Sequence, residues 1–216
     1  MKTALLAGAT GLVGSELLQK IINEPAYNKI HILVRKAIES DSDKVVQHIV
    51  DFNELDKFEI NDSIDHVFCT LGTTIKKAKT KENFRKVDYD YIYELGKKAK
   101  QWNTEKFLVV SSLGANAKSP IFYNRVKGEI ENTLSELKLN QLFIFRPSLL
   151  MGNRKEHRTG EKSAIAVYKI INPLFIGPLK KYKGIQASQV AQGMLQTALN
   201  NKEQFKIFES DEIQKF

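Results

Sequence analysis

The chain has 216 residues, of which 42% are hydrophobic and 27% are charged, so it can bury a substantial core and is typical of a globular protein. Its single cysteine excludes an internal disulfide, its four histidines lack metal-ligand spacing, and no apolar run is long enough for a membrane span or a signal peptide. The net charge of +8 comes largely from dispersed lysines without a nucleic-acid-binding motif, which argues against a nucleic-acid partner. We therefore expect a single cytoplasmic domain that holds no metal ion.

A strand, a glycine-rich turn and a helix are predicted at the start of the chain. Residues 3–7 form a short apolar run of the kind found in buried parallel strands, and apolar residues recur with helical period over residues 12–22. Between them, Gly8 permits a tight turn, Gly11 lets backbone approach a pyrophosphate and Gly14 lets the helix pack closely on the strand. The spacing is GxxGxxG, which an ordinary glycine turn in a parallel sheet can also show. The predicted dinucleotide-binding loop consists of Gly8, Thr10, Gly11, Leu12, Val13 and Gly14.

The remaining elements alternate between strand and helix. Strands are predicted at residues 30–34, 45–50, 66–69, 107–110, 142–145 and 205–208. Helices are predicted at residues 81–102, 122–137, 164–171 and 190–198. Repeated strand–helix units indicate an α/β fold with a single Rossmann-like, doubly wound parallel sheet and helices on both faces. We expect one domain over residues 1–216, in which the irregular C-terminal third, residues 152–216, completes a small substrate-side lobe.

Two basic residues close the second predicted strand. In a doubly wound sheet, ligands bind beyond the carboxyl ends of the strands. Arg35 and Lys36 stand where an NAD site would offer an acidic residue to the ribose 2′-hydroxyl, and two cations suit a 2′-phosphate instead. They therefore favour NADP(H) over NAD(H), with a chance placement of basic residues in a basic chain as the alternative.

The third and fourth strands end in further candidates for cofactor contacts. After the third strand, Asp51 either accepts from the adenine amino group or begins a turn, and Phe52 follows it. After the fourth strand, backbone is expected to approach the cofactor at Thr70, Leu71, Gly72, Thr73 and Thr74.

Candidate catalytic residues follow the fifth strand. Ser111 and Ser112 close it, and Tyr123 and Lys127 lie four residues apart on one face of the next helix. A free tyrosine titrates near about pH 10, so a lysine one turn away and a cationic nicotinamide would help it to exchange protons near neutrality. A serine hydroxyl could then hold the substrate oxygen. A second pair with this spacing begins at Tyr93, in mid-helix and far from any strand end, and a surface role near a helix start is the alternative for the first pair.

Together with the glycine turn, the serines and the Tyr-x-x-x-Lys pair, four longer stretches resemble the short-chain dehydrogenase/reductase superfamily. They are most similar to its atypical branch that contains the Tat-interacting tumour-suppressor oxidoreductase. The stretches are FCTLGTT at residues 68–74, FRKVDYDY at 84–91, VKGEIE at 126–131 and FRPSLL at 145–150.

This resemblance implies an NADP(H)-binding Rossmann fold with a reductase-type triad. In such a triad Tyr123 is the acid/base, and Lys127 tunes it and holds the nicotinamide ribose. Ser112, or else Ser111, is the hydrogen-bond donor to the substrate. The resemblance also places Pro147 among the cofactor-binding residues. Asp88 falls where many extended members have asparagine, which argues against an asparagine-based proton relay.

Several functions remain open from the sequence. We favour an NADP(H)-dependent oxidoreductase for a small carbonyl or alcohol, acting as a monomer or homodimer. The alternative is an NADP(H)-binding regulatory or protein-interaction module with a vestigial triad. A semialdehyde-dehydrogenase-like reaction would need a cysteine nucleophile, but Cys69 lies within a predicted strand, as a core thiol would. Residues 152–184 are expected to form a wall or lid of the substrate pocket, a dimer contact or a surface excursion.

Overall fold

A seven-stranded parallel sheet forms the centre of the computed structural model, which describes residues 1–152 and 182–216. The strands are β1 (Lys2–Ala7), β2 (Tyr27–Val34), β3 (Val45–Ile49), β4 (His66–Cys69), β5 (Lys106–Val110), β6 (Leu142–Arg146) and β9 (Phe205–Glu209). Their order across the sheet is β3-β2-β1-β4-β5-β6-β9, and every neighbouring pair is parallel. The predicted α/β fold with a doubly wound parallel sheet is confirmed.

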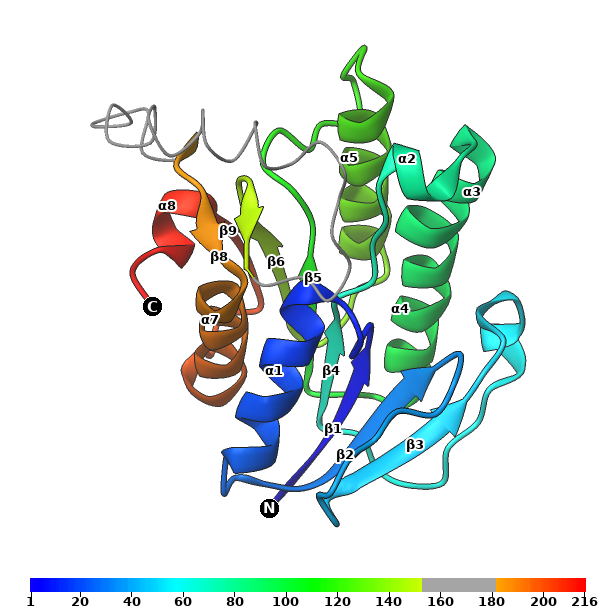
Figure 1. The fold of residues 1–216 in the computed structure, drawn as a ribbon, viewed down its shortest axis with the longest axis vertical. Helices are drawn as coiled ribbons and strands as arrows, with labels where there is room; N and C mark the ends of the chain where they lie inside the picture. The colour runs from blue at the N-terminus through cyan, green and yellow to red at the C-terminus, as the bar shows by residue number, and fades with distance from the viewer. Residues whose placement is uncertain (153–181) are drawn as a thin grey trace.

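Helices cover both faces of the sheet (Figure 1). Two of them, α1 (Leu12–Asn23) and α7 (Ala187–Asn200), lie on one face, whereas α4 (Tyr91–Gln101) and α5 (Phe122–Glu136) lie on the other. The shorter helical elements are η1 (Phe52–Lys57), α2 (Ile75–Ala78), α3 (Lys81–Arg85), η2 (Lys86–Asp90) and α8 (Ser210–Ile213). A separate two-stranded sheet pairs β7 (Leu150–Met151) with β8 (Ile185–Gln186). Within the described residues, no helix is long and apolar enough to cross a membrane.

The helix predicted over residues 81–102 is present over Lys81–Gln101, but it contains a π-helical turn that the sequence did not predict. The α-helix α3 leads into η2, a π-helical turn, before α4 begins. Phe84 and Ile92 lie buried on either side of the turn, so apolar periodicity alone cannot reveal its extra residue. The helix predicted at residues 164–171 lies outside the described part of the chain, as does most of the segment expected to form a lid, and the substrate-side lobe remains a prediction.

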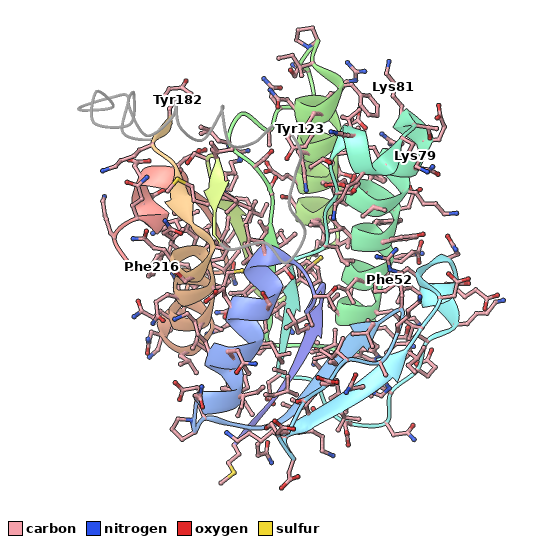
Figure 2. The ribbon with its side chains drawn as sticks, in the orientation of Figure 1. Phe52, Lys79, Lys81, Tyr123, Tyr182 and Phe216 are labelled. Carbon is pink, nitrogen blue, oxygen red and sulfur yellow. The ribbon has the colours of Figure 1, made fainter. Side chains whose placement is uncertain are left out.

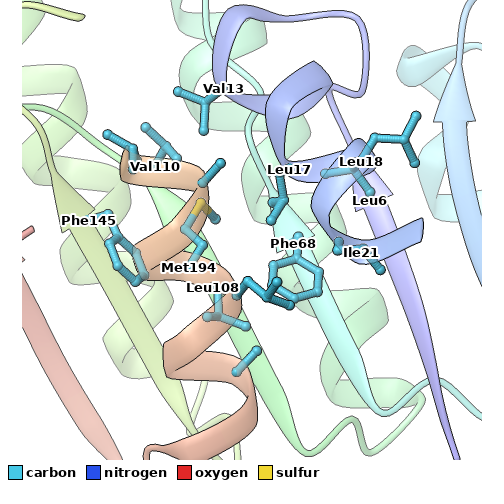
Figure 3. Close-up of a cluster of buried hydrophobic side chains, with 14 of the residues drawn as sticks. Leu6, Val13, Leu17, Leu18, Ile21, Phe68, Leu108, Val110, Phe145 and Met194 are labelled. Carbon is cyan, nitrogen blue, oxygen red and sulfur yellow. The ribbon is translucent and has the colours of Figure 1, made fainter. Parts of the chain in front are cut away.

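The face of the sheet that carries α1 and α7 buries a large apolar cluster (Figure 3). Leu17 and Ile21 of α1 and Met194 of α7 are fully buried there, together with Leu6 of β1 and Phe68 of β4. Burial contributes about 1.5–3 kcal/mol for each large apolar side chain. The helix that follows the glycine turn is therefore held in place by a helix from the C-terminal part of the chain.

The strand order reverses between β1 and β4. From β1 the chain runs outward to β2 and β3, then crosses to β4 and continues outward in the opposite direction through β5, β6 and β9. In folds of this kind, ligands bind in the crevice beyond the carboxyl ends of the strands at such a reversal, here the ends of β1 and β4. The glycine turn follows β1, and the predicted loop of Leu71, Gly72 and Thr73 follows β4.

Candidate functional site

The glycine turn after β1 has the geometry expected of a phosphate-binding loop. Gly8 has a φ of +93°, and the Gly11 amide donates a 2.9 Å hydrogen bond to the Gly8 carbonyl. A Cβ on Gly14 would lie 2.0 Å from that same carbonyl oxygen, so no side chain fits there. Thr70, at the end of β4, donates from Oγ1 to the Ala7 carbonyl at 3.0 Å and thereby joins the two loops.

The start of α1 remains available to an anion. Gly11 is its N-cap and supplies no side-chain hydrogen bond, and both Thr10 and Gly11 are exposed. The N–H groups of the first helical turn, with the positive end of the helix dipole, therefore face the crevice. Of the other predicted loop residues, Val13 has its side chain in the core and Leu12 packs against it, so these two residues can offer only backbone.

The residues that follow β2 are exposed, whereas Asp51, which follows β3, begins a helical turn. Arg35 and Lys36 are exposed after β2. Burial and the Asp51 carboxylate raise the pKa of Tyr91, whereas the positive charge of Arg35 opposes the rise. Asp51 accepts a 2.9 Å hydrogen bond from the Asn53 amide and so begins η1, as the turn interpretation predicts.

Phe52 cannot offer its ring to a cofactor. Its side chain is buried, and its ring lies 5.5 Å from that of Tyr91, centre to centre. The predicted contact from this residue could therefore come only from its backbone.

A buried ion pair lies beneath the loop that follows β4. The Lys127 ammonium is 2.7 Å from Asp88 Oδ1, and neither side chain is more than 4% exposed. Burial alone would lower the pKa of Lys127, but the Asp88 carboxylate and the nearby Tyr123 outweigh it and raise the pKa above its ordinary value. The Asp88 carboxylate therefore favours the charged form of Lys127.

Asp88 also binds the loop itself. Its Oδ2 accepts a 2.8 Å hydrogen bond from the Thr73 amide. Gly72 is exposed directly above, and a Cβ there would lie 3.4 Å from Asp88 Oδ1 and 3.7 Å from Lys127 Nζ. The glycine thus covers the ion pair with backbone only, whereas Leu71 packs its side chain against the core.

Tyr123 lies one helical turn before Lys127, at the end of the molecule where the strands finish (Figure 2). Its ring packs against Phe84 of α3 with 5.4 Å between ring centres, and it is only partly buried. The second pair of this spacing is arranged differently. Lys97 lies 2.7 Å from Glu94 and 5.0 Å from the ring centre of Tyr93, as an exposed surface cation. The two Tyr-x-x-x-Lys pairs thus share their spacing, but Lys127 is buried whereas Lys97 is exposed.

Two buried hydroxyl groups lie at the end of β5. Ser111 and Ser112 are 7% and 9% exposed, and neither Oγ has a hydrogen-bond partner among the described residues. The Leu113 amide donates to the carbonyl of buried Pro147 at 2.9 Å, which fixes this loop beside the end of β6. A buried hydroxyl without a partner is unfavourable, so either serine suits a polar ligand atom.

The chain matches one protein-family model and several curated proteins in sequence. The model of the HIM1 family matches residues 30–175, more than half of the chain. The chain belongs to the HIM1 family. It is 36% identical to protein HTATIP2 of Rattus norvegicus over 164 residues, which cover 74% of this chain and 67% of the relative. It is 31% identical to the mitochondrial protein FMP52 of Eremothecium gossypii over 213 residues, which cover 97% of this chain and 95% of the relative.

Solved structures share the fold of this HIM1-family chain. A UDP-glucose 4-epimerase from Thermotoga maritima, solved with UDP-glucose, has a TM-score of 0.70 at 13% identity, covering 96% of this chain and 76% of the epimerase. WbmH from Bordetella bronchiseptica, solved with NAD+, has a TM-score of 0.70 at 16% identity. The match covers 97% of this chain and 76% of WbmH. The family and the Rossmann-like fold indicated by the sequence are confirmed.

Two residues of this HIM1-family site have roles that the sequence analysis did not assign. Thr70 joins the β1 and β4 loops, and Asp88 joins Lys127 to the loop of Gly72 and Thr73. Asp88 does stand out in the sequence, as an acidic residue within an apolar helical stripe. Thr70 was expected only to let backbone approach the cofactor, because it stands directly after a buried strand, and its hydroxyl contact was not predicted.

Proposed function

We propose that the chain is an NADP(H)-dependent oxidoreductase that acts on a small carbonyl or alcohol. The observation that carries the proposal is the buried ion pair of Lys127 with Asp88, one helical turn from Tyr123 and beneath the loop that follows β4. A cation in this place favours the charged form of a neighbouring phenol, which is what a tyrosine needs in order to exchange protons near neutral pH.

The residues at the crevice suit a dinucleotide. The exposed start of α1 and the side-chain-free Gly14 leave room and N–H donors for a pyrophosphate. Arg35 and Lys36 suit a 2′-phosphate, which is why we propose NADP(H), although WbmH is described with NAD+. The nicotinamide would supply or accept the hydride.

Side chains of the protein transfer the proton and position the substrate. Tyr123 donates its phenolic proton to the substrate oxygen in reduction and takes it back in oxidation. Lys127 compensates the phenolate and hydrogen-bonds the nicotinamide ribose. Ser112 holds the substrate oxygen through its otherwise unpartnered hydroxyl, and Ser111 is the other candidate for this contact.

A screen with purified protein tests the proposal. NADPH binding is first measured by calorimetry, and a panel of aldehydes and ketones is then tested for loss of NADPH absorbance. The proposal expects binding and turnover of at least one compound, with turnover reduced more strongly by Ser112→Ala than by Ser111→Ala. Absence of NADPH and NADH binding would refute it.

A regulatory NADP(H)-binding module is the second candidate function. It is favoured by the fact that Asp88 already pairs with the lysine that the triad would use. Tight NADPH binding without turnover across a broad panel would select this function over the enzyme.

We also propose a monomer or homodimer in the cytoplasm. FMP52 relatives are named mitochondrial, so fractionation of cells that express the tagged protein is the appropriate test. Light scattering during gel filtration determines the oligomeric state.

A further inference from the structure

We propose that Asp88 is a positioning residue, whose carboxylate clamps the Lys127 ammonium to the loop of Gly72 and Thr73. The inference rests on the proposed function, because it assigns a partner to the lysine of the triad. It also accounts for the aspartate in the position where many extended short-chain dehydrogenases have asparagine.

Both carboxylate oxygens of Asp88 are used, and each binds a different element. Oδ1 lies 2.7 Å from Lys127 Nζ on α5, and Oδ2 accepts from the Thr73 amide after β4 at 2.8 Å. The side chain is fully buried. An asparagine has only one acceptor oxygen, so it cannot accept from the amide and from the ammonium through separate oxygens. The clamp therefore requires a carboxylate.

The backbone that carries Asp88 is itself irregular. Asp88 lies in η2, the π-helical turn between α3 and α4. Such turns interrupt the regular hydrogen-bond ladder and occur frequently at functional sites. Among the described residues, Tyr123 on its own helix and Cys69 in β4 also lie close to Lys127, and neither side chain is a carboxylate. Asp88 is thus the counter-charge for the lysine.

Gly72 covers the buried clamp with backbone alone, on the side where the strands end. Gly72 is exposed, and a Cβ added to it would lie in van der Waals contact with both Asp88 and Lys127. An ammonium has three N–H donors, of which the ion pair uses one. A ribose or substrate hydroxyl that approaches past Gly72 would therefore meet a lysine already oriented by Asp88. Because Asp88 also binds Thr73, movement of this loop and movement of the ammonium are coupled.

The clamp is tested first by a double-mutant cycle on the free protein, with thermal unfolding as the readout. Asp88→Asn leaves Lys127 charged and without a counter-charge, and Lys127→Met leaves the carboxylate alone. Each single change is expected to lower Tm by roughly 10 °C. The double variant Asp88→Asn, Lys127→Met removes both charges, so it should be more stable than either single variant. Additive losses would overturn the clamp.

The pH dependence of Lys127→Met distinguishes a charge clamp from simple packing. A buried carboxylate without its cation favours a bound proton in the folded state, so the stability of this variant should rise relative to that of the double variant as pH falls from 7.5 to 5.5; both variants keep the same histidines. The double variant lacks the carboxylate and should not show this rise. Equal pH profiles for the two variants would contradict the proposal.

Gly72→Ala tests access without breaking the ion pair. Gly72 has no positive φ, and the new methyl group would make ordinary contacts, so Tm should stay within about 2 °C of the wild type. NADPH affinity should fall about tenfold, as it should in Asp88→Asn. Unchanged affinity in both variants would refute a positioning role. A wild type that binds no NADPH would refute the proposed function instead, whereas the stability cycle is measured without cofactor.

Discussion

Tyr123 and Tyr93 differ in what surrounds them although each precedes a lysine by four residues. Tyr123 lies beside the buried cation of Lys127, whereas Lys97 is an exposed cation over the Tyr93 ring. We expect Tyr123→Phe to reduce turnover by about 10²–10⁴-fold, the loss typical of a general acid, and to leave NADPH affinity unchanged. Steady-state kinetics with a substrate from the screen measure this, with Tyr93→Phe as the matched control. Equal turnover in the two variants would remove Tyr123 from the reaction.

Arg35 is expected to decide the choice between the two nicotinamide cofactors. It is exposed at the end of β2, where a charged contact to a 2′-phosphate would contribute about 1.5–3 kcal/mol. The wild type should therefore bind NADPH at least tenfold more tightly than NADH, and Arg35→Ala should lose most of this preference. Calorimetric titration of both cofactors checks it. A preference that survives in Arg35→Ala and in Lys36→Ala would count against a 2′-phosphate site here.

Cys69 is expected to be chemically inert in the folded protein. It is fully buried in β4, and burial raises the pKa of its thiol to about 12. A thiol-specific chromogenic reagent should therefore react within minutes in strong denaturant and far more slowly under native conditions. Fast reaction of the native protein would restore the cysteine nucleophile as a candidate.

At the scale of elements, the packing of α1 on β1 depends on Gly14. A Cβ at this position would meet the Gly8 carbonyl at 2.0 Å and Thr70 Oγ1 at 2.6 Å, so the helix would have to move away from the strand. We expect Gly14→Ala to lower the free energy of unfolding by about 1–3 kcal/mol and to weaken NADPH binding. Urea denaturation measures the first effect, and exposed Ser15→Ala in the same turn is the control. Wild-type stability in Gly14→Ala would show that the turn tolerates a side chain.

The strands and longer helices could be predicted because their apolar pattern is local. The glycine turn, β4 and α5 each show their period or spacing within a few consecutive residues. The contacts of Asp88 with Lys127 and Thr73 could not be predicted, because they depend on elements that only the folded sheet brings together. The π-helical turn η2 was hidden for a different reason, since apolar side chains continue on both sides of it.

Across the whole molecule, acid stability depends on histidines far from the candidate site. His66 is fully buried at the start of β4, where its Nδ1 and the Tyr27 hydroxyl share a 2.6 Å hydrogen bond. Burial, and then the positive charge of Lys2, lower the pKa of His66 to about 4, and burial also lowers the pKa values of His31 and His48. The unfolded chain therefore binds protons that the folded protein does not, and stability is lost as pH falls from about 6.5 toward 4.

His66 alone should account for about 3 kcal/mol of this loss. Urea denaturation at intervals between pH 7 and pH 4 measures the slope. His66→Gln keeps an acceptor for Tyr27 but cannot be protonated, so its slope should be smaller than that of the wild type. An unchanged slope would assign the acid sensitivity to other groups.

The contact between α1 and α7 has a consequence for synthesis of the chain on the ribosome. Leu17 and Ile21 are buried partly by Met194, and Lys20 donates to Gln192 at 2.8 Å. The first strand, turn and helix therefore emerge long before the helix that covers them is translated. Until then, apolar surface beside the glycine turn stays open to water and to chaperones. The part of the crevice formed by α1 is thus made before α7 but is completed only when α7 has packed against it.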